Sequence, residues 1–98
     1  MTDTPDVAST ANTGELVIIT GPEWQGRAIE ISGRDSAARR QVRVLRRRGA
    51  GAPLFSAVFP RLPAGLYTLW RDAAESAGTV VVAAAMVTEL EWWSPPPA

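Results

Sequence analysis

The sequence predicts an all-β fold, a single seven-stranded antiparallel β-sandwich. Seven short runs alternate apolar with polar residues or are rich in β-branched residues, and glycine, proline or small polar residues bound them. Their spacing along the chain is typical of a sandwich. The chain has 98 residues, of which 46% are hydrophobic, which suits one small domain with one core. We expect a flexible arm at 1–13, the sandwich at 14–93 and a proline-rich tail at 94–98.

The first three strands are expected at residues 15–20, 27–32 and 39–47. The first is apolar at all four positions from Leu16 to Ile19, and hence on both faces, so it should lie in the middle of a sheet. The second alternates in pattern and follows a turn bracketed by Gly21 and Gly26. The third alternates valine with glutamine and arginine.

The last four strands are expected at residues 54–59, 66–71, 79–83 and 86–92. A loop that holds Pro60, Pro63 and Gly65 separates the first two of these. The last two should pair as a hairpin joined by Ala84 and Ala85. The prolines of the tail then end the domain, because proline cannot continue a ladder of backbone hydrogen bonds.

The stretch from Phe59 to Leu69 has the pattern F-x-x-L-x-x-G-x-Y-x-L, in which Phe59, Leu62, Tyr67 and Leu69 should be buried together. This pattern resembles the middle of the prealbumin-like sandwiches, the carboxypeptidase regulatory-like and collagen-adhesin B-type (Cna-B-like) domains. The resemblance implies a seven-stranded antiparallel sandwich of prealbumin-like type. It implies no single function, because this architecture serves many.

Missing residue types exclude most enzyme chemistry. The chain has no cysteine, no histidine and no lysine, so no thiolate, imidazole or amine is present to act as nucleophile or base. The usual ligands of zinc, copper and haem are also missing. No histidine is available for the site of the transthyretin-like hydrolases, which share the fold that the resemblance implies. We therefore expect no enzymatic activity, no cofactor and no metal.

All ten positive side chains are arginine, and eight of them fall between residues 27 and 48. Arg39, Arg43 and Arg47 should lie on one face of the third strand, as a row that is able to grip phosphates or carboxylates. The row would suit an acidic protein partner or nucleic acid. The alternative is an edge strand protected by charge from pairing with other chains.

Four tryptophans form the second candidate feature. Neighbouring residues of a strand point to opposite faces, so Trp92 and Trp93 cannot both enter the core. Trp93 shares its face with glutamates and is expected to be the exposed one. Exposed tryptophan anchors many protein interfaces and stacks on sugar rings, so Trp24 and Trp93 are candidate binding residues. The alternative is that Trp24 caps the sandwich and that the tail covers Trp93.

These observations favour a non-catalytic protein-interaction or accessory module, which binds a protein partner or a second copy through a strand edge or through Trp24, Arg39, Arg43, Arg47 and Trp93. The alternatives are a carbohydrate- or small-ligand-binding module and, with less support, nucleic-acid binding. No apolar run is long enough to span a membrane, and the acidic N-terminus is unlike a signal peptide. A cytoplasmic location is therefore expected.

Overall fold

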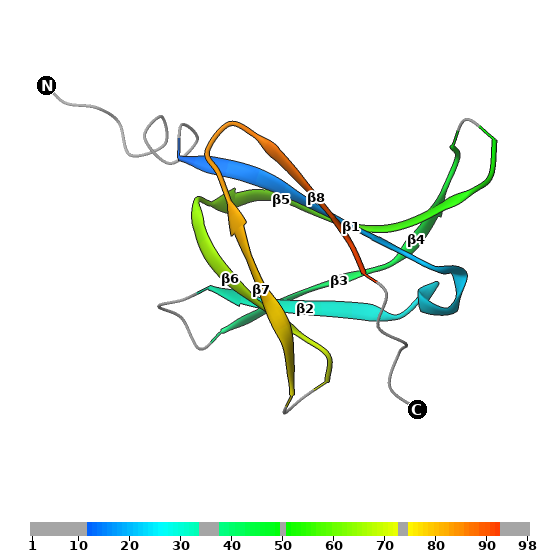
Figure 1. Ribbon diagram of the computed structural model, residues 1–98, viewed down its shortest axis with the longest axis horizontal. Helices are drawn as coiled ribbons and strands as arrows, with labels where there is room; N and C mark the ends of the chain where they lie inside the picture. Colours follow the sequence, from blue (N-terminus) through cyan, green and yellow to red (C-terminus); the bar gives the residue numbers. More distant parts are fainter. Residues whose placement is uncertain (1–11, 34–37, 50, 73–74, 93–98) are drawn as a thin grey trace, which may run out of the picture.

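The computed structural model describes residues 12–33, 38–49, 51–72 and 75–92, and in this part the protein is all-β. Two four-stranded sheets pack on each other, as Figure 1 shows. The elements are β1 (Thr13–Thr20), the single 3-10 turn η1 (Pro22–Trp24), β2 (Ala28–Gly33), β3 (Arg39–Arg43), β4 (Leu45–Arg47), β5 (Leu54–Pro63), β6 (Gly65–Trp70), β7 (Ser76–Val82) and β8 (Val87–Glu91). Residues 1–11 of the predicted arm and the predicted tail at 94–98 lie outside the described residues.

Sheet A has the strand order β4-β5-β1-β8, and sheet B has the order β3-β2-β6-β7. The prediction that the first strand is central is confirmed, because β1 lies between β5 and β8. All pairs of neighbouring strands are antiparallel except one, since β1 and β8 run parallel. The prediction of seven antiparallel strands is therefore wrong in two respects, the number of strands and the direction of β8.

The eighth strand arises because the predicted strand at 39–47 is two strands in different sheets. β3 pairs with β2 in sheet B, and β4 pairs with β5 in sheet A. Val44 separates them and is fully buried. Its N–H donates to the carbonyl oxygen of Arg27, and its own carbonyl oxygen accepts from the N–H of Gly26, both at 2.9 Å. Burial of this valine and its two hydrogen bonds to the segment after η1 fix the point where the chain changes sheets.

The predicted hairpin of the last two strands is also wrong. β7 pairs with β6 in sheet B, whereas β8 pairs with β1 in sheet A. The connection bends at Ala85, which has a φ of 60°, and its N–H donates to the carbonyl oxygen of Thr13 at 2.7 Å. Gly14 lies so close to this connection that an added Cβ would clash with the carbonyl oxygen of Ala83. The connection therefore forms backbone hydrogen bonds with the start of β1, whereas a hairpin would form them between its own two strands.

The predicted core around Phe59 is confirmed, since Phe59, Leu62, Tyr67 and Leu69 are all at most 6% exposed. They join residues of both sheets in one cluster with the following members: Leu16, Ile18, Trp24, Ile29, Ile31, Val44, Ala57, Phe59, Leu62, Tyr67, Leu69, Val82 and Trp92.

The segment that was expected to be a loop, with Pro60 and Pro63, continues strand β5 as far as Pro63. The register with β1 shifts between Gly14 and Leu16, and Arg61 opposite this shift has a φ of 55°. Such a bulge accommodates a proline within a strand. The Tyr67 hydroxyl then donates to the carbonyl oxygen of Pro63 at 2.6 Å, across the corner where β5 passes to β6. This bond resembles the tyrosine corner of other sandwiches.

Candidate functional site

The predicted arginine row does not form, because its members lie on two sheets. Arg39 and Arg43 project from β3 in sheet B, whereas Arg47 projects from β4 in sheet A. Apolar and polar residues continue to alternate past Val44, but the chain leaves sheet B at this residue and enters sheet A. β3 does lie at an edge of its sheet, as the alternative interpretation of the row requires.

Arg39 is held in a polar network on the outer face of sheet B. Its Nη1 lies 3.1 Å from Oε1 of Glu30 and donates to the carbonyl oxygen of Asp72 at 3.2 Å. Its Cζ stands 3.8 Å from the centre of the Trp70 ring. Nε1 of Trp70 in turn donates to Oγ of Ser32 at 2.8 Å. The guanidinium of Arg39 is thus already paired with a carboxylate, a carbonyl and an aromatic face, and these contacts give it a structural role.

The other two predicted arginines are exposed, and each donates one hydrogen bond to its own domain. Nη1 of Arg43 donates to the carbonyl oxygen of Gly26 at 2.7 Å, and Nε of Arg47 donates to Oγ of Ser56 at 2.8 Å. Ser56 is itself buried, at 4% exposure, on the outer side of β5. The Arg47 side chain therefore lies back across the outer face of sheet A.

Trp24 does not lie on the surface. It is 2% exposed, and its ring meets that of Trp92 edge-on, with the centroids 5.7 Å apart and the planes at 87°. The turn η1 carries Trp24 into the core, which corrects its assignment as a partner-binding residue. Trp92 is 5% exposed, which confirms that it faces inward. Trp93 lies outside the described residues.

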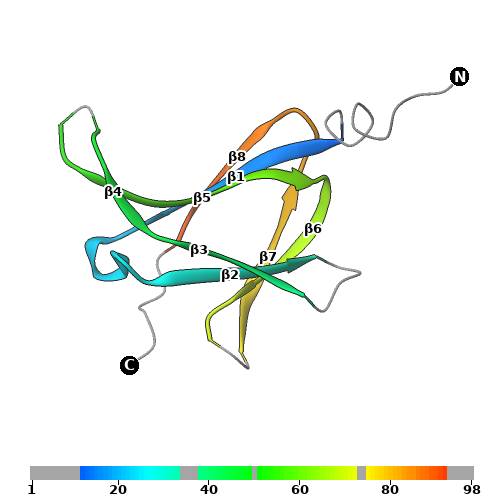
Figure 2. The same cartoon turned by 180° about the vertical axis from the view of Figure 1, so that it is seen from behind.

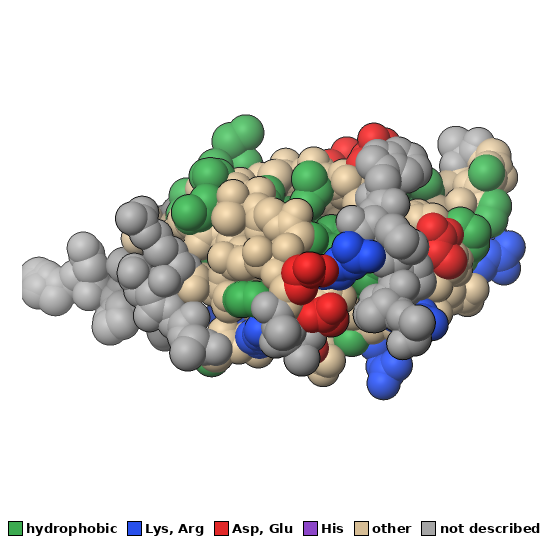
Figure 3. All heavy atoms as spheres, turned by 60° about the horizontal axis from the view of Figure 1, so that its bottom comes forward, with side chains coloured by type: hydrophobic (Ala, Val, Ile, Leu, Met, Phe, Trp, Pro, Cys, Tyr) green, Lys and Arg blue, Asp and Glu red, His purple; other side chains and the backbone are tan. Residues whose placement is uncertain are grey.

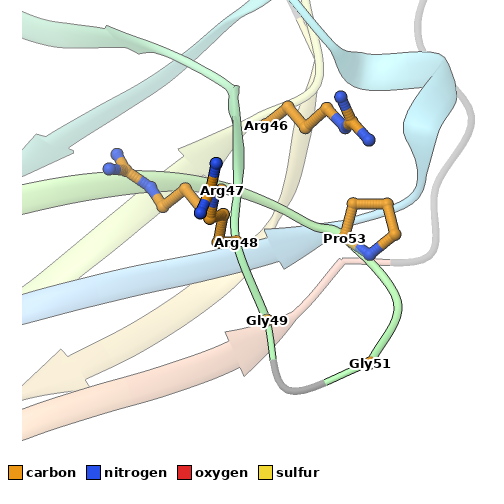
Figure 4. A pocket seen from close by; sticks show the side chains of 6 residues that line it. All are labelled: Arg46, Arg47, Arg48, Gly49, Gly51 and Pro53. Atoms are coloured by element: carbon orange, nitrogen blue, oxygen red, sulfur yellow. The ribbon is translucent and has the colours of Figure 1, made fainter.

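A hollow of about 560 Å³ is lined by the hairpin of β4 and β5 and contains three consecutive arginines. The hairpin extends past one end of the sandwich, as Figures 1 and 2 both show. Figure 4 shows Arg46 pointing away from Arg47 and Arg48, with Gly49, Gly51 and Pro53 completing the wall. Because the guanidinium groups do not converge, the hollow does not offer the clustered donors that grip a phosphate or a carboxylate.

Acidic side chains are scattered over the described part of the chain. No three acidic side chains there lie close enough to hold a metal ion. Burial raises the pKa of Tyr67, and the nearby Arg40 guanidinium opposes that rise. The carboxylates of Glu89 and Glu91 are on the outer face of β8, and Glu75 lies 3.6 Å from Arg71 in an exposed pair.

The outer faces of the two sheets differ in chemistry. That of sheet B holds the polar network around Arg39, together with Gln41 and Thr68. That of sheet A is apolar at its centre, where Val17, Ile19 and Val58 are only half-buried. Outward positions of a sandwich are usually polar, so the face of sheet A is the exception. The sequence signal for it was the doubly apolar first strand, which we interpreted only as a sign of a central position.

The four edge strands differ as well. β3 and β4 carry arginines and β8 carries two glutamates, whereas β7 has the sequence SAGTVVV and carries no charge. Thr79 and Val81 of β7 are exposed, Val81 to 63%. Met86, in the connection from β7 to β8, and Val87, the first residue of β8, are 60% and 57% exposed. Figure 3 shows hydrophobic side chains standing out at its upper left.

Comparisons of the chain with protein-family models, with curated proteins and with solved structures find no match. Within the described residues, no helix is long and apolar enough to cross a membrane.

Proposed function

We propose that this chain is a non-catalytic protein-interaction module of the prealbumin-like kind, and that strand β7 is the edge through which it binds an extended segment of a partner. The observation that carries the proposal is the absence of charge from β7, while β3, β4 and β8 are all charged. Charged side chains are a common means of preventing a sheet edge from pairing with another chain. Three edges of this domain have that protection and one does not.

The residues of β7 suit the addition of a strand. Thr79, Val80 and Val81 are β-branched residues, which favour extended pairing. Gly78 and the register shift opposite Leu69 and Trp70 interrupt the first part of β7, so the regular edge runs over residues 78–82. A partner strand added there would gain backbone hydrogen bonds, and its alternate side chains would meet Val80 on the inner side and Val81 on the outer side. The expected ligand is thus an uncharged, β-branched segment.

The two alternative functions have less support. A sugar platform requires an exposed aromatic face, whereas Trp24 and Trp92 are buried and Arg39 covers one face of Trp70. A nucleic-acid surface requires arginines in one groove, and those of β3 and β4 lie on different sheets.

Site-specific photocrosslinking in the native host tests the proposal. A photoreactive residue at position 81 should capture a partner, whereas one at position 41 should not. Gln41 is the matched control, because it is exposed on the outer face of the same sheet but on the charged edge strand β3. Absence of any adduct specific to position 81 would refute the proposed edge.

The captured protein then allows a quantitative test. Val81→Lys should weaken its binding by about tenfold or more, because the lysine protects the edge, whereas Gln41→Lys should have little effect. The side chain of Val81 is mostly exposed, so the substitution should leave the fold intact. Equal affinity of the Val81→Lys variant and the unaltered protein would also exclude β7 as the binding edge.

A further inference from the structure

The outer face of sheet A combines an apolar centre with opposite charges at its two sides. Val17, Ile19 and Val58 form the centre. On the β4 side lie the exposed Leu45 and Arg47, and Arg47 is held over Ser56 by its 2.8 Å hydrogen bond. On the β8 side lie Glu89 and Glu91, both exposed and in no ion pair with a described residue. A face with this arrangement complements a copy of itself.

We infer that two copies of the chain associate through this face, related by a twofold axis that runs parallel to the strands and passes between β5 and β1. This surface is separate from the β7 edge, and the inference goes beyond the proposed function. Rotation about this axis exchanges the two sides of the sheet, so that β5 of one copy covers β1 of the other and β4 covers β8. The same patch then meets itself, as a closed dimer requires.

The strand register shows which residues would meet. Val17 is level with Val58 on one side and with Glu89 on the other, and Ile19 is level with Ser56 and Glu91. The axis therefore places Val58 of one copy over Val17 of the other. Leu45 is level with Ser56, so the axis places Leu45 of one copy over Glu91 of the other. The Arg47 guanidinium, which lies over Ser56, then faces Ile19 of the other copy and is one strand spacing, about 4.8 Å, from the Glu91 position. Each dimer thus gains two apolar contacts and two Arg47–Glu91 contacts by symmetry.

A twofold axis running across the strands would instead place β8 over β8. Glu89 and Glu91 of the two copies would then face each other, and like charges oppose such a contact. The charges therefore favour one of the two orientations. With strands about 4.8 Å apart and a rise of about 3.4 Å per residue, four strands and the length of β1 give a footprint of about 500 Å² on each copy. A total near 1,000 Å² is small for a specific interface, so a weak, concentration-dependent dimer is expected.

Sedimentation equilibrium of the full chain from micromolar to near-millimolar concentration tests the inference. The mass should rise from 10.5 kDa toward twice that value, about 21 kDa. Arg47→Glu and Glu91→Arg should each weaken the dimer by about tenfold, because each creates two like-charge contacts. An equimolar mixture of the two variants should recover association, since both contacts in the mixed dimer again join opposite charges. The double variant should recover it as well.

Two controls separate this face from other surfaces. Arg43→Glu reverses an exposed arginine on the outer face of sheet B and should leave the dimer unchanged. Val81→Lys alters the β7 edge and should also leave it unchanged, so failure of one proposal does not affect the other. A chain that is monomeric at every concentration refutes the inference. So does a dimer in which the mixture of Arg47→Glu and Glu91→Arg associates no better than either variant alone.

Discussion

The substitution Tyr67→Phe tests the corner between β5 and β6 with a single oxygen atom. It removes the 2.6 Å hydrogen bond to the carbonyl oxygen of Pro63 while the ring stays in the core. Loss of one such bond costs about 0.5 to 1.5 kcal/mol in the free energy of unfolding. For a domain of this size, about 1 kcal/mol corresponds to a fall in Tm of roughly 4 to 8 °C. Thermal and urea denaturation measure both quantities.

The same residue should control the alkaline stability of the domain. Burial raises the pKa of Tyr67 in the folded chain, so folding favours the neutral phenol. As the pH rises past the ordinary value of 10.0, the unfolded chain loses this proton before the folded chain does. The stability contributed by Tyr67 is therefore present below pH 10 and declines above it. Tyr67→Phe should abolish this decline.

Composition makes this effect measurable. Tyr67 is the sole tyrosine, and the chain has no lysine and no cysteine, so no other side chain titrates near this pH. Tyrosinate absorbance then reports Tyr67 alone, and Arg40→Gln should raise the pKa further by removing the opposing charge. An ordinary tyrosine titration in the folded protein, together with unchanged stability of Tyr67→Phe, would refute the reasoning.

Substitutions of Leu62, Trp92 and Arg39 and one binding assay test other contacts. Leu62→Ala should lower the free energy of unfolding by about 2 to 5 kcal/mol in urea, because Leu62 is fully buried; an unchanged midpoint would contradict this core. Trp92→Ser should unfold the domain by circular dichroism, whereas Trp92→Phe should be tolerated better, since the indole N–H has no acceptor among the described residues. Arg39→Lys should destabilise sheet B by about 1 kcal/mol, because an ammonium cannot both pair with Glu30 and stack on Trp70 as a guanidinium does. Oligonucleotides at low salt should not bind; salt-sensitive binding that is lost when Arg39, Arg43 and Arg47 become serine would revive the nucleic-acid hypothesis.

The sequence alone predicted the positions of most strands and the centre of the core. Alternation of apolar and polar residues is local, so it identified the first strand and the run from Tyr67 to Leu69. It also placed Trp92 inside, because neighbouring residues of a strand point to opposite faces. These features depend only on which face of its own strand a residue occupies.

Strand pairing required the tertiary structure. Nothing in the alternation of residues 39–47 shows that Val44 bonds to the segment after η1 and that the chain then enters the other sheet. Likewise, the short connection through Ala84 and Ala85 predicts a hairpin from sequence. In the structure, this connection forms hydrogen bonds with Thr13 and Glu15 at the start of β1. Strand pairing depends on contacts between segments that are far apart in sequence. Apolar and polar residues alternate with a period of two in both sheets, so the alternation does not show which sheet a strand joins.

For the candidate binding surfaces too, the sequence predicted one part and the tertiary structure decided the other. From residue types alone, the sequence showed a chain rich in arginine and tryptophan, and the missing residue types led us to expect no enzymatic activity. Only the fold decided that Trp24 is buried, that Arg39 is engaged and that Arg47 lies on the other sheet from Arg43. It also revealed that β7 is an edge without charge and that Val17, on the outer face of sheet A, is only half-buried among the described residues. Exposure belongs to the arrangement of strands in space, because the same valine is core or surface according to what packs over it.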